Sequence, residues 1–128
     1  MRTTKITQLQ SWGITVLRVV TGTLFLEAAL HDLFVGDVSL SIIVVGKLVE
    51  LVCGAALVVG LVTRWVSILI ALLMLADIMI FHPPHGFVVA DTGFEYALLR
   101  LAASVTLALS GPGKVALDNV LVIRRGLR

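Results

Sequence analysis

The amino-acid sequence predicts an all-α integral membrane protein, built as an antiparallel four-helix bundle with a short surface helix at its C-terminus. Of its 128 residues, 59% are hydrophobic and only 14% are charged, whereas the apolar share of a soluble domain is nearer half. Four apolar runs, at residues 12–34, 40–62, 65–81 and 94–110, each reach the length of a transmembrane helix, for which about 17 residues is the lower limit. We therefore expect one membrane domain over residues 1–128.

The first span, residues 12–34, opens at Trp12. A basic start before an apolar run is also typical of a signal peptide, but Arg18 interrupts this run and no clean small-residue cleavage site follows it. We therefore expect an uncleaved span. Because Arg18 lies about 9 Å from Trp12 along the helix axis, its side chain either reaches lipid phosphates at the inner interface or pairs with another helix.

The second and third spans, residues 40–62 and 65–81, are joined by a tight connection at Thr63-Arg64. Pro83-Pro84 closes the third span, because proline cannot continue a helix. Short connections of this kind place consecutive helices antiparallel to one another.

An outer loop, residues 82–93, leads to the fourth span, residues 94–110, which Gly111-Pro112-Gly113 ends. The following segment, residues 114–125, has apolar residues at helical spacing beside two arginines, a pattern typical of a helix on the membrane surface.

The basic residues predict the orientation. Seven of the ten flank one side of the predicted membrane and three lie inside spans, whereas the loops on the other side hold none. By the positive-inside rule, both termini are then cytoplasmic and residues 82–93 face outward. The seven flanking residues are Arg2, Lys5, Arg64, Lys114, Arg124, Arg125 and Arg128.

Several function classes are disfavoured. The formal charge of +2 is scattered along helix ends, which argues against a nucleic-acid partner. Cys53 is the single cysteine, so no internal disulfide can form, and no cofactor-binding motif occurs, so we expect no intrinsic cofactor and no catalysis by this chain alone. His82 and His85 are weak candidates for metal ligands, since two prolines separate them and no further cluster would complete a site.

Ionisable residues inside the spans gather in the outer half of the predicted bundle. Counting helical rise from the outer ends places acids and bases from all four spans at one depth, with His31 one turn from Glu27 and with Asp32 and Glu95 nearer the rim. Charged groups are costly in a bilayer and should face inward and pair. The candidate pocket residues are Glu27, His31, Lys47, Glu50, Asp77, Glu95 and Arg100.

In the deep part of this layer three acids stand against two bases. We therefore expect that one carboxyl is protonated, that His31 is cationic, or that a ligand supplies a positive or hydrogen-bonding group. Glu50 is the deepest acid and the best candidate to carry the proton. A proton-accepting carboxyl near a histidine in a lipid-accessible pocket suits quinone or proton chemistry. In the other interpretation, the same charges only hold the helices in register.

Nearly the whole chain resembles the DoxX-like family of small membrane proteins. The resemblance is carried by Leu17-Arg18 with Gly22 and Phe25-Leu26, by Glu50-Leu51-Val52-Cys53-Gly54 and Gly60-Leu61-Val62-Thr63-Arg64, by His85-Gly86-Phe87, and by Gly93-Phe94-Glu95-Tyr96-Ala97-Leu98-Leu99 with Gly111-Pro112-Gly113 and Ala116-Leu117-Asp118. The chain departs from the family near the outer end of the first span, where it has Ala29 and Asp32 instead of the family's frequent Gly and Lys.

The resemblance implies a four-helix, multi-pass protein of the inner (plasma) membrane. It also implies a link to quinone-linked thiosulfate oxidation, or to membrane complexes that handle sulfur or oxidative stress, alongside partner subunits. We therefore expect a subunit of a redox-linked system with a bound quinone or lipid. The competing expectation is a purely structural accessory subunit of a larger respiratory or other energy-converting complex. A carrier for small solutes or protons is disfavoured, because no span is broken by an internal proline.

Overall fold

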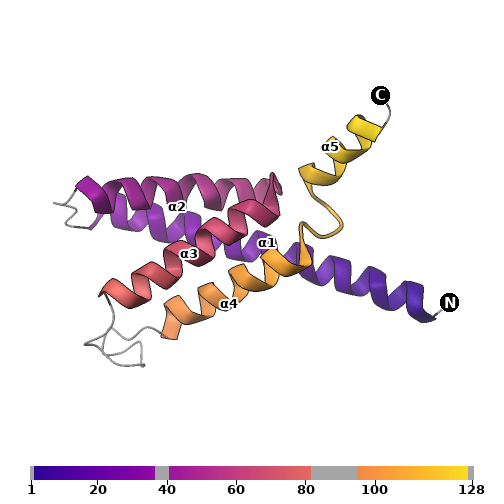
Figure 1. Cartoon of the computed structure of the whole chain (residues 1–128), viewed down its shortest axis with the longest axis horizontal. Coiled ribbons are helices and arrows are strands. Elements are labelled where there is room, and N and C mark those ends of the chain that lie inside the picture. The colour runs from indigo at the N-terminus through magenta and orange to yellow at the C-terminus, as the bar shows by residue number, and fades with distance from the viewer. Residues whose placement is uncertain (1, 37–40, 82–94, 127–128) are drawn as a thin grey trace.

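The computed structural model describes residues 2–36, 41–81 and 95–126, and over these residues the protein is all-α, as predicted (Figure 1). No described residue lies in a strand. The helices are α1 (Arg2–Phe34), α2 (Ser41–Val59), α3 (Thr63–Phe81), α4 (Glu95–Ser110) and α5 (Leu117–Gly126).

Three of the described helices are long and apolar enough to cross a membrane, over Thr4–Phe34, Ser41–Val59 and Thr63–Ile80. This agrees with the prediction of an integral membrane protein. Helix α1 begins at Arg2, ten residues before the predicted span, because hydropathy marks only the part of a helix that faces hydrocarbon. The polar residues before Trp12 continue the same helix.

The connection between α2 and α3 lies at residues 60–62, not at Thr63-Arg64 as predicted. Gly60 and Val62 both have a positive φ, at 78° and 49°, and this reverses the chain. Thr63 is then the first residue of α3. Its backbone N–H donates to the Asp118 carboxylate at 2.8 Å, which satisfies an amide that has no partner inside the helix.

Four helices surround the core. Helix α1 packs along α2, α3 packs along α4, and α2 contacts α3 while α1 contacts α4. The fully buried side chains Phe25, Leu57, Ile70 and Leu107 come from one helix each. Many other large apolar side chains are exposed on the outer helix faces, as expected where those faces meet lipid acyl chains.

Small residues set the approach of α1 to α2. A Cβ atom added at Gly22 would lie 2.9 Å from the carbonyl oxygen of Gly54, and one added at Gly54 would lie 3.0 Å from the carbonyl oxygen of Gly22. Only glycine fits at such a crossing, since it brings the two backbones into direct contact.

The segment between α4 and α5 is tied to α1 by buried polar groups. Arg18 is 2% exposed, and its guanidinium donates to the carbonyl oxygens of Pro112, at 2.9 Å, and Val115. The Thr15 hydroxyl oxygen accepts the Lys114 N–H at 3.0 Å. Of the two alternatives for Arg18, the reach to lipid phosphates is therefore wrong, because backbone carbonyls within the protein take its hydrogen bonds.

The ends of the helices gather at two opposite ends of the bundle (Figure 1). The start of α1, the α2–α3 turn and α5 lie toward one end, while the last turns of α1 and α3 and the first turns of α2 and α4 lie toward the other. The predicted outer loop, with His82 and His85, lies outside the described residues.

Candidate functional site

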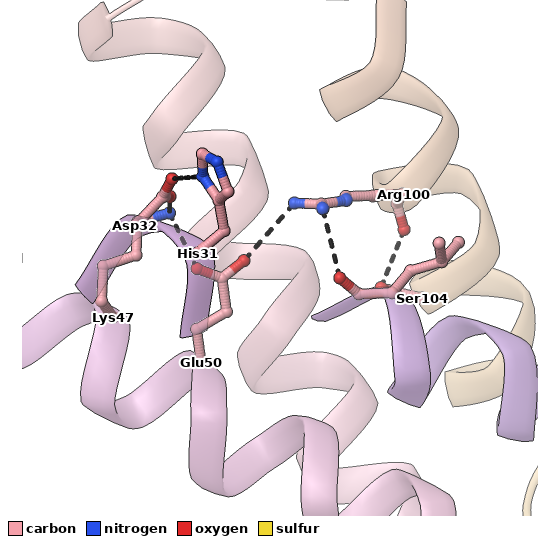
Figure 2. Close-up of polar contacts among 7 residues, drawn as sticks. His31, Asp32, Lys47, Glu50, Arg100 and Ser104 are labelled. Carbon is pink, nitrogen blue, oxygen red and sulfur yellow. Dashed lines mark hydrogen bonds and ion pairs between the residues drawn. The ribbon is translucent and has the colours of Figure 1, made fainter. Parts of the chain in front are cut away.

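A cluster of charged side chains joins α1, α2 and α4 (Figure 2). The Lys47 ammonium of α2 lies 2.9 Å from a carboxylate oxygen of Asp32 on α1 and 2.9 Å from Oε2 of Glu50, one turn further along α2. The spacing of three residues puts Lys47 and Glu50 on one helix face. Lys47 therefore links two helices through two carboxylates.

Arg100 of α4 completes the cluster. One guanidinium nitrogen lies 3.6 Å from Oε1 of Glu50, which is an ion pair but longer than a hydrogen bond. Another donates to the carbonyl oxygen of Leu24 at 3.3 Å. The guanidinium also lies over the rings of Tyr96 and Phe25, at 4.4 and 5.1 Å from their centroids, in cation–π geometry.

The charges of the cluster balance. Asp32 and Glu50 stand against Lys47 and Arg100, so two acids face two bases and the four groups sum to zero. The sequence count of three acids against two bases differs, because it left out Asp32 and included Glu27, which lies outside the cluster, and Asp77, which lines the adjoining cavity. His31 lies at its edge, with Nδ1 3.6 Å from Asp32 and a side chain that is 62% exposed.

A cavity of about 540 Å³ lies between α2 and α3, beside this cluster. Its walls are mainly apolar. Two of the lining residues, Ile42 and Ile80, are 79% and 68% exposed. The cavity is lined by Asp32 of α1, by Ile42, Ile43, Gly46, Lys47 and Glu50 of α2, and by Leu73, Met74, Ala76, Asp77 and Ile80 of α3.

The predicted pocket residues divide into two groups. Lys47, Glu50 and Asp77 line the cavity, and His31 and Arg100 belong to the adjoining cluster. Glu27 and Glu95 are exposed and belong to neither the cavity wall nor the cluster. Within the described part of the chain, no group of three or more histidine, cysteine, aspartate or glutamate residues could hold a metal ion.

Asp32 is the site residue that the sequence analysis missed. The buried positions of α1 are Thr15, Arg18, Thr21, Gly22, Phe25 and Ala29. They repeat at intervals of three and four residues, so they form one face of the helix. The next position in this series is Asp32, whereas Glu27 lies off it. Polar and small residues recur among these buried positions, and this pattern could have identified the inward face of α1 from the sequence.

Comparison with protein families gives a match to the DoxX family model over residues 13–83. The matched region includes α1 from Gly13 onward, α2 and α3, and therefore every residue that lines the cavity. Comparison with curated protein sequences gives no match, and comparison with solved structures gives none either.

Proposed function

Because the chain belongs to the DoxX family, we propose that it is a membrane subunit of a redox-linked system, concerned with quinones, sulfur compounds or oxidative stress. In this proposal the cavity between α2 and α3 holds a quinone-like or lipid ligand. The observation that supports it best is the composition of the cavity wall, in which apolar side chains surround a few charged groups gathered at one place. Ligand pockets commonly have this composition, and volumes of about 300 to 1,000 Å³.

We propose that α1 to α4 cross the inner (plasma) membrane as an antiparallel four-helix bundle, with both termini in the cytoplasm. Arg64, Lys114 and Arg124 support this orientation, since they lie toward the end of the helices that holds the start of α1. Helix α4 has 16 residues, or about 24 Å by helical rise, so it spans with local thinning of the bilayer or with flanking residues at the interfaces.

The cavity and the cluster have separate roles in this proposal. Apolar residues of α2 and α3 hold a hydrocarbon tail, and the groups around Lys47 meet the polar head. The sequence carries one cysteine and no cofactor-binding motif, so the proposal assigns electron transfer to a partner protein. The chain contributes binding, orientation and hydrogen bonds.

A second candidate function is a structural accessory subunit of a larger respiratory or other energy-converting complex. One observation favours it: the ion pairs of the cluster connect different helices, from Asp32 of α1 to Lys47 of α2 and from Glu50 of α2 to Arg100 of α4. Charges arranged in this way hold helices in register without any ligand.

Mass spectrometry of the protein, extracted gently from its native membrane, separates the two candidates. The measurement records bound small molecules and partner proteins for the unmodified chain, for Glu50→Gln and for Glu27→Gln. The same substitution at Glu27 is a matched control, since Glu27 lies off the cavity wall. We expect a bound amphiphile that is lost in Glu50→Gln and retained in Glu27→Gln. Partner proteins without any bound small molecule would favour the accessory subunit.

A further inference from the structure

We infer that the head group bound in this cavity is electrically neutral and carries a carbonyl oxygen, and that Lys47 donates a hydrogen bond to that oxygen. This inference rests on the proposed function, in which the cavity holds an amphiphile, and it specifies the chemical class of that amphiphile.

The hydrogen-bonding capacity of Lys47 supports a ligand that carries a hydrogen-bond acceptor. An ammonium group has three N–H donors. Two of them point at carboxylates, since Nζ lies 2.9 Å from Asp32 Oδ2 and 2.9 Å from Glu50 Oε2. The tetrahedral geometry of the group directs the third N–H away from both. Because Lys47 lines the cavity and its side chain is 23% exposed, a ligand in the cavity can reach this donor.

The charge balance supports a neutral ligand. The single positive charge of Lys47 is shared between Asp32 and Glu50, and Arg100 faces Glu50 from the side of α4. A phosphate head group beside Lys47 would therefore meet two carboxylates at close range. Juxtaposed like charges are strongly unfavourable where water is excluded.

A cationic head group fits no better. It brings no acceptor for the third N–H of Lys47, and it would stand beside the Lys47 ammonium. A carbonyl oxygen satisfies the donor without adding charge, as polar groups in the interior of a membrane protein require.

The polar and apolar parts of the cavity wall are separated along α2, as a polar head group and an apolar tail require. From Ile42 to Glu50 the wall runs about 12 Å along α2 by helical rise. The two polar residues of α2 on this wall, Lys47 and Glu50, lie toward its inner end, and Ile42 and Ile80 flank its outer end. The ring carbonyl of a quinone and the ester carbonyl of a neutral diacylglycerol share the required chemistry.

Binding of defined probes to the full-length chain, purified in mild detergent and stripped of lipid, tests this inference. The three probes are a long-chain benzoquinone, a diacylglycerol and phosphatidylglycerol, titrated separately and followed by native mass spectrometry. We expect one benzoquinone or one diacylglycerol per chain, bound at least about tenfold more tightly than phosphatidylglycerol. Whichever of the two neutral probes binds more tightly identifies the source of the carbonyl.

Two variants probe the role of each charge. Lys47→Met removes the donor and should weaken binding of the neutral probe by about tenfold. Asp32→Asn keeps an acceptor for Lys47 but removes one negative charge. It should therefore reduce the difference in affinity between the neutral probes and phosphatidylglycerol. This variant tests the inference even if Lys47→Met fails to fold. Glu27→Gln removes a negative charge away from the cavity and should leave the preference unchanged.

The outcomes separate this inference from the proposed function. If phosphatidylglycerol binds the unmodified chain as tightly as the neutral probes, or if Glu27→Gln changes the preference as much as Asp32→Asn does, the inference is wrong while a ligand role for the cavity stands. If none of the three probes binds and the native extract carries no amphiphile, the proposed function itself is wrong.

Discussion

The guanidinium of Arg18, inside α1, donates a hydrogen bond to the carbonyl oxygen of Pro112, 2.9 Å away and 94 residues further along the chain. A second hydrogen bond goes to the carbonyl oxygen of Val115. A Cβ added at Gly60 would clash with the same guanidinium, and Gly60 has a φ of 78°, a backbone conformation that favours glycine. The α2–α3 turn, α1 and the α4–α5 connection thus meet around one buried arginine.

Arg18→Met should loosen the α4–α5 connection, because it leaves two partly buried carbonyl groups without their donors, at a cost of up to about 1–3 kcal/mol. Hydrogen exchange should speed up at the Lys114 amide, which donates to Thr15, and at the Asp118 amide, which donates to Gly60. Arg18→Lys should give an intermediate result, since an ammonium lacks the planar fork that serves two carbonyls. Unchanged exchange at both amides in Arg18→Met would show that the connection holds without this arginine.

Gly22→Ala should destabilise the packing of α1 on α2. The added Cβ would lie 2.9 Å from the Gly54 carbonyl oxygen and 2.9 Å from Val58, and overpacking of this kind costs about 1–3 kcal/mol. Gly13→Ala, on the same helix, is the matched control, because its Cβ meets no atom within 4 Å. In mixed detergent micelles, the free energy of unfolding should be higher for Gly13→Ala than for Gly22→Ala. Equal stability would mean that the helices can separate slightly without loss.

Gly46→Leu should remove the ligand without unfolding the protein. Gly46 lines the cavity and has open space around its Cβ position, so a larger side chain enters the cavity instead of the core. Mass spectrometry should find the amphiphile lost, and circular dichroism should find the helical content retained. Gly13→Leu provides the comparison at an exposed position outside the cavity. Full ligand retention in Gly46→Leu would place the ligand elsewhere.

A double-mutant cycle between Glu50 and Arg100 should measure how far the cluster holds the helices together. Both side chains are buried, at 4% and 11% exposed, and they lie 3.6 Å apart. We expect Glu50→Gln and Arg100→Gln to couple by about 0.5–3 kcal/mol in the free energy of unfolding. Glu50→Gln removes the carboxylate that faces Arg100, and Arg100→Gln removes one of the two cations beside Glu50.

For comparison, Glu95 is the first residue of α4, whereas Arg64 of α3 donates to the carbonyl oxygen of Leu109 near the other end of α4. The effects of Glu95→Gln and Arg64→Gln on the free energy of unfolding should therefore be additive. A coupling near zero for Glu50 and Arg100 would remove the main support for the structural accessory subunit. Strong coupling, together with partner proteins and no bound small molecule in the native extract, would instead favour that second candidate.

The sequence by itself determined that the protein is an all-α membrane protein of the DoxX family. Long apolar runs leave no other secondary structure that satisfies backbone hydrogen bonds in lipid. Glycine and proline mark where a helix ends, as at Gly111-Pro112-Gly113 after α4, where Gly111 has a positive φ. These features are local and need no knowledge of neighbouring helices.

Only the tertiary structure decided which charged residues meet. Helix α1 carries apolar side chains on all sides, and both the lipid and the protein core are apolar, so hydrophobic patterning does not set the rotation of the helix about its axis. Close backbone contact at Gly22 and Gly54 and the buried hydrogen bonds of Arg18 set that rotation instead. Because these contacts turn one face of α1 inward, Asp32 reaches Lys47 and Glu27 does not.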